Sequence, residues 1–115
     1  MSKAGDAGRD GENRVVACLI EAGYPDAERR RLQGVNDRGD IAGVSRGVVI
    51  EVKAAPSRYE IAEWLKETDK ELANADGDIG VCWFKIRGTR DPKRWAVMMR
   101  GDIWLKLLER WTKEA

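Results

Sequence analysis

The feature that most constrains the fold is a helix-length segment placed between two apolar, strand-like segments. Residues 47–54 are rich in β-branched side chains, and residues 79–86 form a nearly continuous apolar run, as expected for a strand covered on both faces. Between them, apolar side chains recur at helical spacing from residue 57 to residue 76. Because a connection that contains a helix is long enough to cross over a sheet, the two strands can pair in parallel.

The segments on either side complete a predicted element order of α-β-β-β-α-β-β-α. Helical spacing of apolar side chains predicts a first helix over residues 9–23, and residues 27–33 and 39–44 are expected to form short strands. A further strand is expected over residues 94–99, followed by a last helix that Asp102 caps. This order predicts an α/β domain with a central mixed β-sheet flanked by helices.

The second helix is expected to begin at Ser57, because Ser57 and Glu60 have the spacing of a capping box. Asp76 and Gly77 are expected to end it. The side chains predicted to face the core are Ile61, Ala62, Leu65, Thr68 and Leu72 on this helix, and Ile103, Leu107, Leu108 and Trp111 on the last one.

The length of 115 residues predicts one domain, which we assign to residues 9–115, with residues 1–8 as a flexible N-terminus. The chain is 43% hydrophobic and 36% charged, too apolar for a disordered protein, and it contains no uncharged stretch of the length of a bilayer span. The first ten residues lack the apolar core of a secretion signal. We therefore expect an intracellular, cytoplasmic protein without a membrane partner, and its composition is compatible with a phage origin.

The chain contains no histidine, which excludes a His-dependent general base, a Ser-His-Asp triad and a Cys/His zinc cluster. Cys18 and Cys82 lie within apolar patterns and are predicted to be small core residues. Any chemistry must therefore depend on carboxylates and lysine.

Three charged residues interrupt the apolar strand segments: Asp40, Glu51 and Lys53. If the hairpin between residues 39–44 and 47–54 turns at Ser45–Arg46, Asp40 lies directly across from Glu51, and Lys53 points to the same side. Opposed carboxylates repel each other unless a cation lies between them, so this arrangement favours a divalent metal with oxygen ligands. Glu12 falls on the sheet-facing side of the first helix and adds a fourth charged group.

Each of these residues also has an ordinary explanation when it is taken alone. Glu12 can be an acid favoured at a helix N-terminus, and Asp40 can be a turn residue after Gly39. Glu51 and Lys53 can be a solvated pair on an edge strand. Their coincidence around one hairpin favours a functional site over these separate explanations.

The same residues resemble the motif of the PD-(D/E)XK nuclease superfamily. The matching pieces are Glu12, then Gly39-Asp40-Ile41, then Val49-Ile50-Glu51-Val52-Lys53, in an α-β-β-β-α-β order like that of the family core. The short length, the Gly8-to-Glu12 spacing and an arginine at the first strand are most similar to archaeal-type Holliday junction resolvases. The resemblance covers about residues 8–86, and a glycine precedes the aspartate where the nominal family motif has proline.

The resemblance implies a restriction-endonuclease-like core and a metal-dependent endonuclease that resolves four-way DNA junctions by phosphodiester hydrolysis. Asp40, Glu51 and the backbone carbonyl of Val52 would bind Mg²⁺, with Mn²⁺ as an alternative, and Glu12 would complete or orient the metal shell. Lys53 would hold or activate the attacking water. Because Mg²⁺ prefers a few carboxylates plus waters, the residues agree with this chemistry.

The distribution of charge predicts a DNA-binding surface, although the net charge is only +1. Residues 27–58 contain seven Lys and Arg against four Asp and Glu, and residues 85–100 contain six against one. Residues 59–78 contain two against seven. Arg90, Lys93 and Arg94 can alternatively belong to a merely solvated loop. The predicted DNA-contacting residues are Arg9, Arg29, Arg30, Arg31, Arg38, Arg58, Arg90 and Lys93.

Resolution of a four-way junction needs two cuts, so the expected partners are branched DNA and a second copy of the chain in a homodimer. Trp83 and Trp95 lie in strand segments and are predicted core residues, whereas Trp64, Trp104 and Trp111 lie on helices, where an exposed pair would suit a dimer interface. Two alternatives stay open. The chain can be another nuclease of the superfamily that acts on linear or damaged DNA, or a non-catalytic nucleic-acid- or protein-binding module with this fold.

Overall fold

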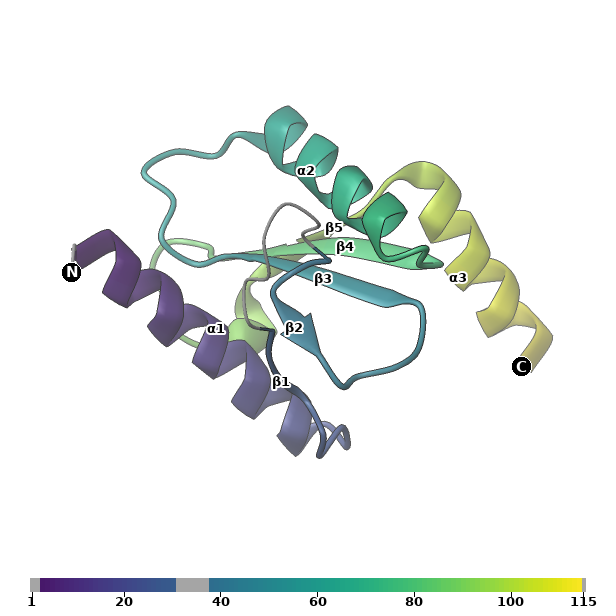
Figure 1. Ribbon diagram of the computed structural model, residues 1–115, viewed down its shortest axis with the longest axis horizontal. Coiled ribbons are helices and arrows are strands. Elements are labelled where there is room, and N and C mark those ends of the chain that lie inside the picture. The colour runs from purple at the N-terminus through teal and green to yellow at the C-terminus, as the bar shows by residue number, and fades with distance from the viewer. Residues whose placement is uncertain (1–2, 31–37, 115) are drawn as a thin grey trace.

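The computed structural model describes residues 3–30 and 38–114, which form a five-stranded mixed sheet with helices on both faces (Figure 1). The predicted order of helices and strands is confirmed, with one added 3-10 turn. In chain order the elements are α1 (Lys3–Glu21), β1 (Glu28–Arg29), β2 (Ile41–Ala42), β3 (Val48–Lys53), α2 (Ile61–Asn74), β4 (Ile79–Phe84), η1 (Pro92–Arg94), β5 (Ala96–Met98) and α3 (Gly101–Glu114). In the described part of the chain, no helix is long and apolar enough to cross a membrane.

The strands are arranged in the order β1-β2-β3-β4-β5. β3 and β4 are parallel, as the intervening helix α2 allows, and the other neighbouring strands are antiparallel. β2 pairs with β3 through Ile41 and Ile50, which confirms the predicted hairpin register. Asp40 therefore lies at the end of β2, beside the part of β3 that contains Glu51.

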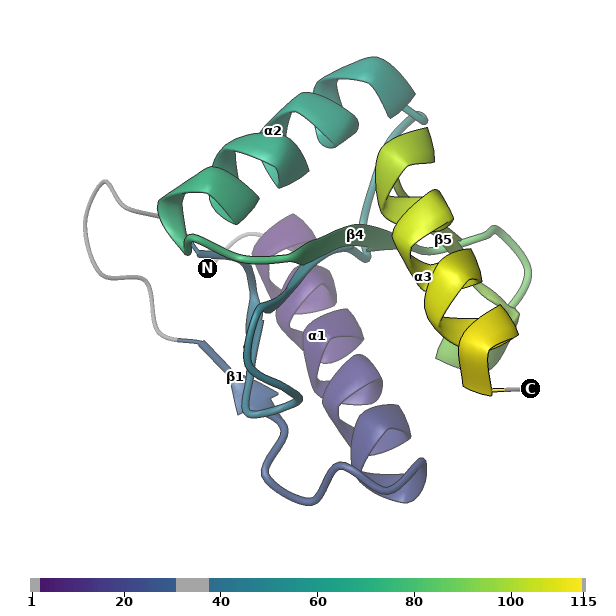
Figure 2. The ribbon, with the colours of Figure 1, turned by 90° about the vertical axis from the view of Figure 1, so that its right-hand side faces the viewer.

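α1 covers one face of the sheet, and α2 and α3 cover the other (Figures 1 and 2). Alternation along β3 sends Ile50 and Val52 into a core with Val15 and Leu19 of α1. Val49 points the opposite way, into a core with residues of α2 and α3. By the same alternation, Glu51 and Lys53 face α2.

Gly11 allows α1 to approach the end of β3 very closely. A Cβ atom at this position would overlap the Cβ of Ala54, and it would also contact Trp95. The absence of a side chain thus brings the first half of α1, including Glu12, against the sheet.

The helices begin at different residues from those predicted. α1 starts at Lys3 rather than at residue 9. α2 starts at Ile61, and its N-cap residue Glu60 makes no side-chain capping hydrogen bond, so the predicted capping box is wrong. The segment before α2 stays non-helical because Tyr59 packs edge-on against Trp64 and Phe84.

The predicted core face of α2 is wrong in its first turn. Ile61 is 46% exposed and Ala62 is exposed too, whereas Trp64 is only 5% exposed and packs against Phe84. Burial of this indole turns the helix away from the predicted orientation and removes Trp64 from any dimer surface. The residues that α2 buries are Trp64, Thr68, Glu71 and Leu72.

α3 also differs from its prediction. Asp102 lies inside the first turn and accepts hydrogen bonds from the Arg100 guanidinium (2.8 and 2.6 Å), so it does not serve as the predicted N-cap. Ile103 is buried and Leu107 packs against the same core, but Leu108 and Trp111 are exposed, so the predicted core face is confirmed only in the first half of the helix. In the strand segments, Trp95 is buried and Trp83 packs against the core, as predicted.

Candidate active site

Asp40 is the residue around which the predicted site assembles. Its Oδ2 accepts a hydrogen bond from the backbone N–H of Val52 (2.7 Å), which fixes the carboxylate against β3. Its side chain also hydrogen-bonds Glu51, and its negative charge raises the pKa of both Glu12 and Lys53. The structure therefore places Asp40 in contact with Glu51 and close enough to Glu12 of α1 and Lys53 of β3 for their charges to interact.

The backbone at Asp40 is held as firmly as its side chain. Its N–H donates to the carbonyl of Ile50 (2.8 Å), and its carbonyl accepts from the N–H of Arg30 (2.7 Å). Gly39 has a φ of +94°, and a Cβ there would crowd the carbonyl oxygen of Ile50. Proline, whose φ is fixed near −65°, cannot adopt this conformation, which explains why glycine precedes the aspartate in this chain.

Glu51 is the most deeply buried of the four charged groups, with 5% of its surface exposed. Burial raises its pKa to about 8; the hydrogen bond to Asp40 opposes this shift, and the neighbouring carboxyl of Glu71 adds to it. At neutral pH and without a bound metal ion, Glu51 therefore holds a proton. A metal ion bound at Glu51 must displace that proton.

Lys53 points toward α2, where its Nζ donates a hydrogen bond to Oε2 of Glu67 (2.6 Å). Burial alone would lower the pKa of Lys53, but the bond to Glu67 and the charge of Glu51 outweigh it, so the pKa is raised. Lys53 is thus an ammonium group in this structure. It can donate hydrogen bonds to water or to a phosphoryl oxygen.

Glu12 reaches the site from the opposite face of the sheet. Burial and the charge of Asp40 raise the pKa of Glu12, and Arg29 partly offsets them. Nε of Arg29 lies 3.5 Å from Oε1 of Glu12, so Arg29 is the first-strand arginine that reaches the acidic cluster. The half-buried position of Glu12 matches the sheet-facing side predicted for it.

The sequence interpretation missed two acidic residues of α2, Glu67 and Glu71. Together with Glu51 they offer carboxylate oxygens that lie within 4.8 Å of one another. Glu71 is only 4% exposed. Acidic residues four apart on a charged helix resemble a solvated face, but Glu71 is three residues after Thr68, on the side that α2 buries.

The donor set around Asp40 fits a hard, oxygen-binding cation. Asp40 is hydrogen-bonded to Glu51, whose carboxylate oxygens lie within 4.8 Å of those of Glu67 and Glu71, and histidine is absent from the whole chain. Burial raises the pKa of the nearby Cys82 thiol to about 12, so this residue offers no thiolate at neutral pH. Magnesium and manganese suit such a site better than zinc does.

A groove of about 360 Å³ opens beside Lys53 at the end of β3. It runs from Gly8 of α1 past Lys53 and Arg58 to Trp64 of α2. The groove gives a ligand access to the ammonium group of Lys53, although Glu51 behind it is buried.

The predicted DNA-contacting cations differ in their surroundings. Arg38 and Arg90 are exposed, and Arg31 lies outside the described residues. Nε of Arg30 is buried without a hydrogen-bond partner. Surface ion pairs, which are weak in water, join Arg9 to Asp6, Arg58 to Glu60 and Lys93 to Glu21.

The chain matches no protein-family model, and comparison with curated proteins and with solved structures finds no significant match. The chemistry of the site must therefore be inferred from its own residues. These provide oxygen ligands for a divalent cation, one ammonium donor and an open groove beside it. Such a set suits the hydrolysis of an anionic ester.

Proposed function

We propose that this protein is a metal-dependent endonuclease of the PD-(D/E)XK type, with a restriction-endonuclease-like core, that cleaves four-way DNA junctions. The observation that carries the proposal is the convergence of Asp40, Glu51 and Lys53 beside one strand pair, with Glu12 approaching from α1. A sheet interior has no structural need for this combination of charges, because each of them costs desolvation energy.

Asp40 and Glu51 would hold the metal, Mg²⁺ or Mn²⁺, together with the backbone carbonyl of Val52, and Glu12 would complete or orient the shell. When bound, such an ion acidifies a water molecule and neutralises charge on the phosphoryl oxygens. Asp40 is already oriented for this role by the N–H of Val52. Glu51 must give up its proton, which makes metal binding stronger as pH rises through the pKa of Glu51.

Lys53 supplies the hydrogen-bond donors of the site. As an ammonium group it holds the attacking water and stabilises negative charge that develops on the phosphoryl oxygens. Its exposure to the groove at the end of β3 allows contact with a DNA backbone. Glu67 fixes the position of the ammonium group through the 2.6 Å ion pair.

Two symmetric cuts in a junction require two copies of this site, so we place the chain in a homodimer. The described surface carries an apolar patch on α3 that suits this contact. Trp104 and Trp111 are 53% and 73% exposed, and a groove of about 420 Å³ runs beside them.

The test is cleavage of a synthetic four-way junction and of a linear duplex with the sequence of two of its arms, both in Mg²⁺. We expect paired incisions in the junction and little cleavage of the duplex. Glu51→Gln and Lys53→Ala should abolish cleavage but keep DNA binding, and Glu63→Gln, on an exposed acid of α2, is the control.

Equal cleavage of both substrates would contradict the proposed junction specificity and would indicate a nuclease that acts on linear DNA. Absence of cleavage of any DNA, in Mg²⁺ and in Mn²⁺, by a protein that still binds DNA would overturn the enzymatic proposal. A non-catalytic binding module would then account for the basic surface.

A further inference from the structure

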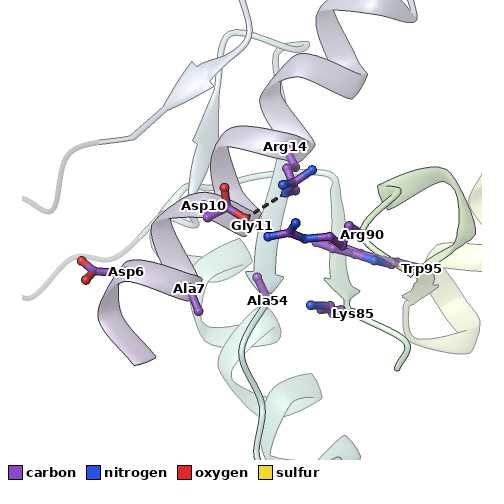
Figure 3. A pocket seen from close by; sticks show the side chains of 9 residues that line it. All are labelled: Asp6, Ala7, Asp10, Gly11, Arg14, Ala54, Lys85, Arg90 and Trp95. Atoms are coloured by element: carbon purple, nitrogen blue, oxygen red, sulfur yellow. Dashed lines mark hydrogen bonds and ion pairs between the residues drawn. The ribbon is translucent and has the colours of Figure 1, made fainter. Parts of the chain in front are cut away.

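A second cleft lies at the end of β3, on the face of the sheet that α1 covers (Figure 3). Its volume is about 290 Å³, and the candidate active site does not use it. We call it the basic cleft and define it by Gly11, Arg14, Ala54, Lys85, Arg90 and Trp95; Asp6 and Asp10 of α1 also line it.

Cations outnumber anions among the groups that converge on the centre of the basic cleft. Figure 3 shows Asp10 beside Arg14 and Arg90, with Lys85 farther along the cleft and Asp6 set apart from this group. Nε of Arg14 donates to Oδ2 of Asp10 (2.8 Å). The hydrogen bond from Arg14, and also the charges of Arg90 and Lys85, lower the pKa of Asp10.

Among the described residues, neither Lys85 nor Arg90 takes part in an ion pair with an acidic side chain. Arg14 alone is enough to neutralise Asp10. Asp6, the other acid of the cleft, pairs with Arg9, so the positive charges of Lys85 and Arg90 remain for an anionic ligand.

The floor of the basic cleft is small and firmly held. Gly11 has no side chain, and Ala54 packs directly against it. The buried indole of Trp95 is anchored by a hydrogen bond from its Nε1 to the carbonyl of Thr89 (3.0 Å). A group that combines an anion with apolar neighbours, such as a phosphodiester between two sugars, matches this combination of cations and apolar floor.

The basic cleft adjoins the candidate active site through the backbone. Ala54 follows Lys53 and lines both the basic cleft and the groove beside Lys53. The N–H of Lys85 donates to the carbonyl of Lys53 (2.9 Å). Because neighbouring residues of a strand point to opposite faces, Lys53 faces α2 while Ala54 faces α1.

We propose that the basic cleft binds a backbone phosphate of the DNA strand that is cut, close to the phosphate held at Lys53. The strand then crosses the end of the sheet, from the α2 face at Lys53 to the α1 face at Lys85 and Arg90. This proposal rests on the proposed nuclease function, and it adds a binding site that the PD-(D/E)XK motif residues do not include.

The test uses the full chain and a fluorescently labelled four-way junction in EDTA, with binding measured by anisotropy at several salt concentrations. Lys85→Ala/Arg90→Ala should bind about tenfold more weakly at low salt, because two charge-assisted contacts are lost. The slope of log K against log salt should fall by about one for each contact removed.

The charge-matched control is Arg46→Ala/Lys113→Ala, which removes two exposed cations from the β2–β3 turn and from α3. It should keep the wild-type slope. Asp10→Asn should have the opposite effect and tighten binding, because it removes the negative charge that Arg14 now neutralises. Lys85→Gln/Arg90→Gln replaces the alanine variant if the latter melts at a lower temperature than the wild type.

An unchanged affinity and salt slope in the double variant that keeps the wild-type melting temperature, alanine or glutamine, would overturn the proposal, and so would weaker binding by Asp10→Asn. Failure of the nuclease proposal has a different signature, which is a wild-type protein that cuts no DNA in Mg²⁺ or Mn²⁺. If the slope of log K against log salt is nevertheless smaller for the cleft variants than for the wild type, the cleft binds phosphate without an associated cleavage reaction.

Discussion

At the scale of single residues, the burial of Glu51 ties the stability of the fold to pH. The folded protein holds a proton on Glu51 up to about pH 8, whereas an ordinary glutamate releases it near 4.5. Between these values the folded state binds more protons than the unfolded chain. The free energy of unfolding must therefore fall as pH rises through this window.

We predict that the metal-free protein loses stability, on the order of a few kcal/mol, between about pH 5 and pH 9. Glu51→Gln should remove most of this loss, since it abolishes the titrating group, and the exposed Glu63→Gln should not. Denaturant unfolding in EDTA at a series of pH values measures this change in the free energy of unfolding. Superimposable pH profiles for wild type and Glu51→Gln would contradict the role assigned to burial.

Glu67 offers a test of how Lys53 is positioned. Glu67→Gln keeps a hydrogen-bond acceptor but removes the charge that raises the pKa of Lys53. We predict a roughly tenfold fall in cleavage rate, and a shift of the alkaline limb of the pH–rate profile to lower pH. A profile identical to that of Glu63→Gln would show that the ion pair is incidental.

The residues of the candidate site differ in how easily they can be predicted from the sequence. Asp40, Glu51 and Lys53 could be predicted, because a charge within an apolar strand is conspicuous. Glu67 and Glu71 could not, since charge on a helix is ordinary and only packing shows which acids face inward. The conformation of Gly39 likewise became clear only from its φ of +94°.

At the scale of elements, local rules worked where geometry leaves few choices. The pairing of Ile41 with Ile50 has the predicted register, because the buried faces of both strands allow only one alignment. The turn itself forms at Arg46–Gly47, where the N–H of Val48 donates to the carbonyl of Ser45, and not at the predicted Ser45–Arg46. The capping box predicted at Ser57 does not form, because Tyr59, within that segment, packs on the distant Phe84 instead of entering a helix. Packing of Trp64 on Phe84 likewise sets which face of α2 is buried, and the spacing of apolar residues in the sequence does not reveal this contact.

The contact between α1 and β3 can be tested at Gly11. Gly11→Ala should destabilise the fold by about 1–3 kcal/mol, because the new methyl group overlaps Ala54, and it should also slow cleavage by displacing Glu12. Gly8→Ala, one turn earlier in open space, should leave stability unchanged or raise it.

Urea unfolding of both variants measures the difference. Combining Gly11→Ala with Ala54→Gly should restore part of the lost stability, because it removes the atom that is overlapped. A Gly11→Ala protein as stable as the wild type would contradict the close approach of α1.

At the scale of the whole molecule, the element order was enough to predict a mixed sheet between helices, because α2 forces a crossover between β3 and β4. The outer surface was harder to predict. An apolar helix face indicates burial, but it does not tell whether the chain itself or a partner buries it. Trp111 was expected in the core and is 73% exposed.

We predict that α3 mediates a homodimer, and that Trp111→Glu shifts it to monomer by placing a charge in the contact. Tyr24→Glu, at an exposed aromatic residue near the end of α1, is the control and should stay dimeric. Sedimentation at micromolar concentration distinguishes the two species. A wild-type protein that is monomeric, both free and on junction DNA, would rule out paired cutting.

Cleavage of a four-way junction with and without Mg²⁺ tests most directly the proposal that carboxylates around Asp40 hold a catalytic divalent ion. The wild type and the control Asp26→Asn, on an exposed acid, should cut in Mg²⁺ and stop in excess EDTA. Asp40→Asn should bind the junction without cutting it, because the carboxylate oriented by Val52 is lost. Cleavage by the wild type in excess EDTA, or by Asp40→Asn at the wild-type rate, would contradict the account.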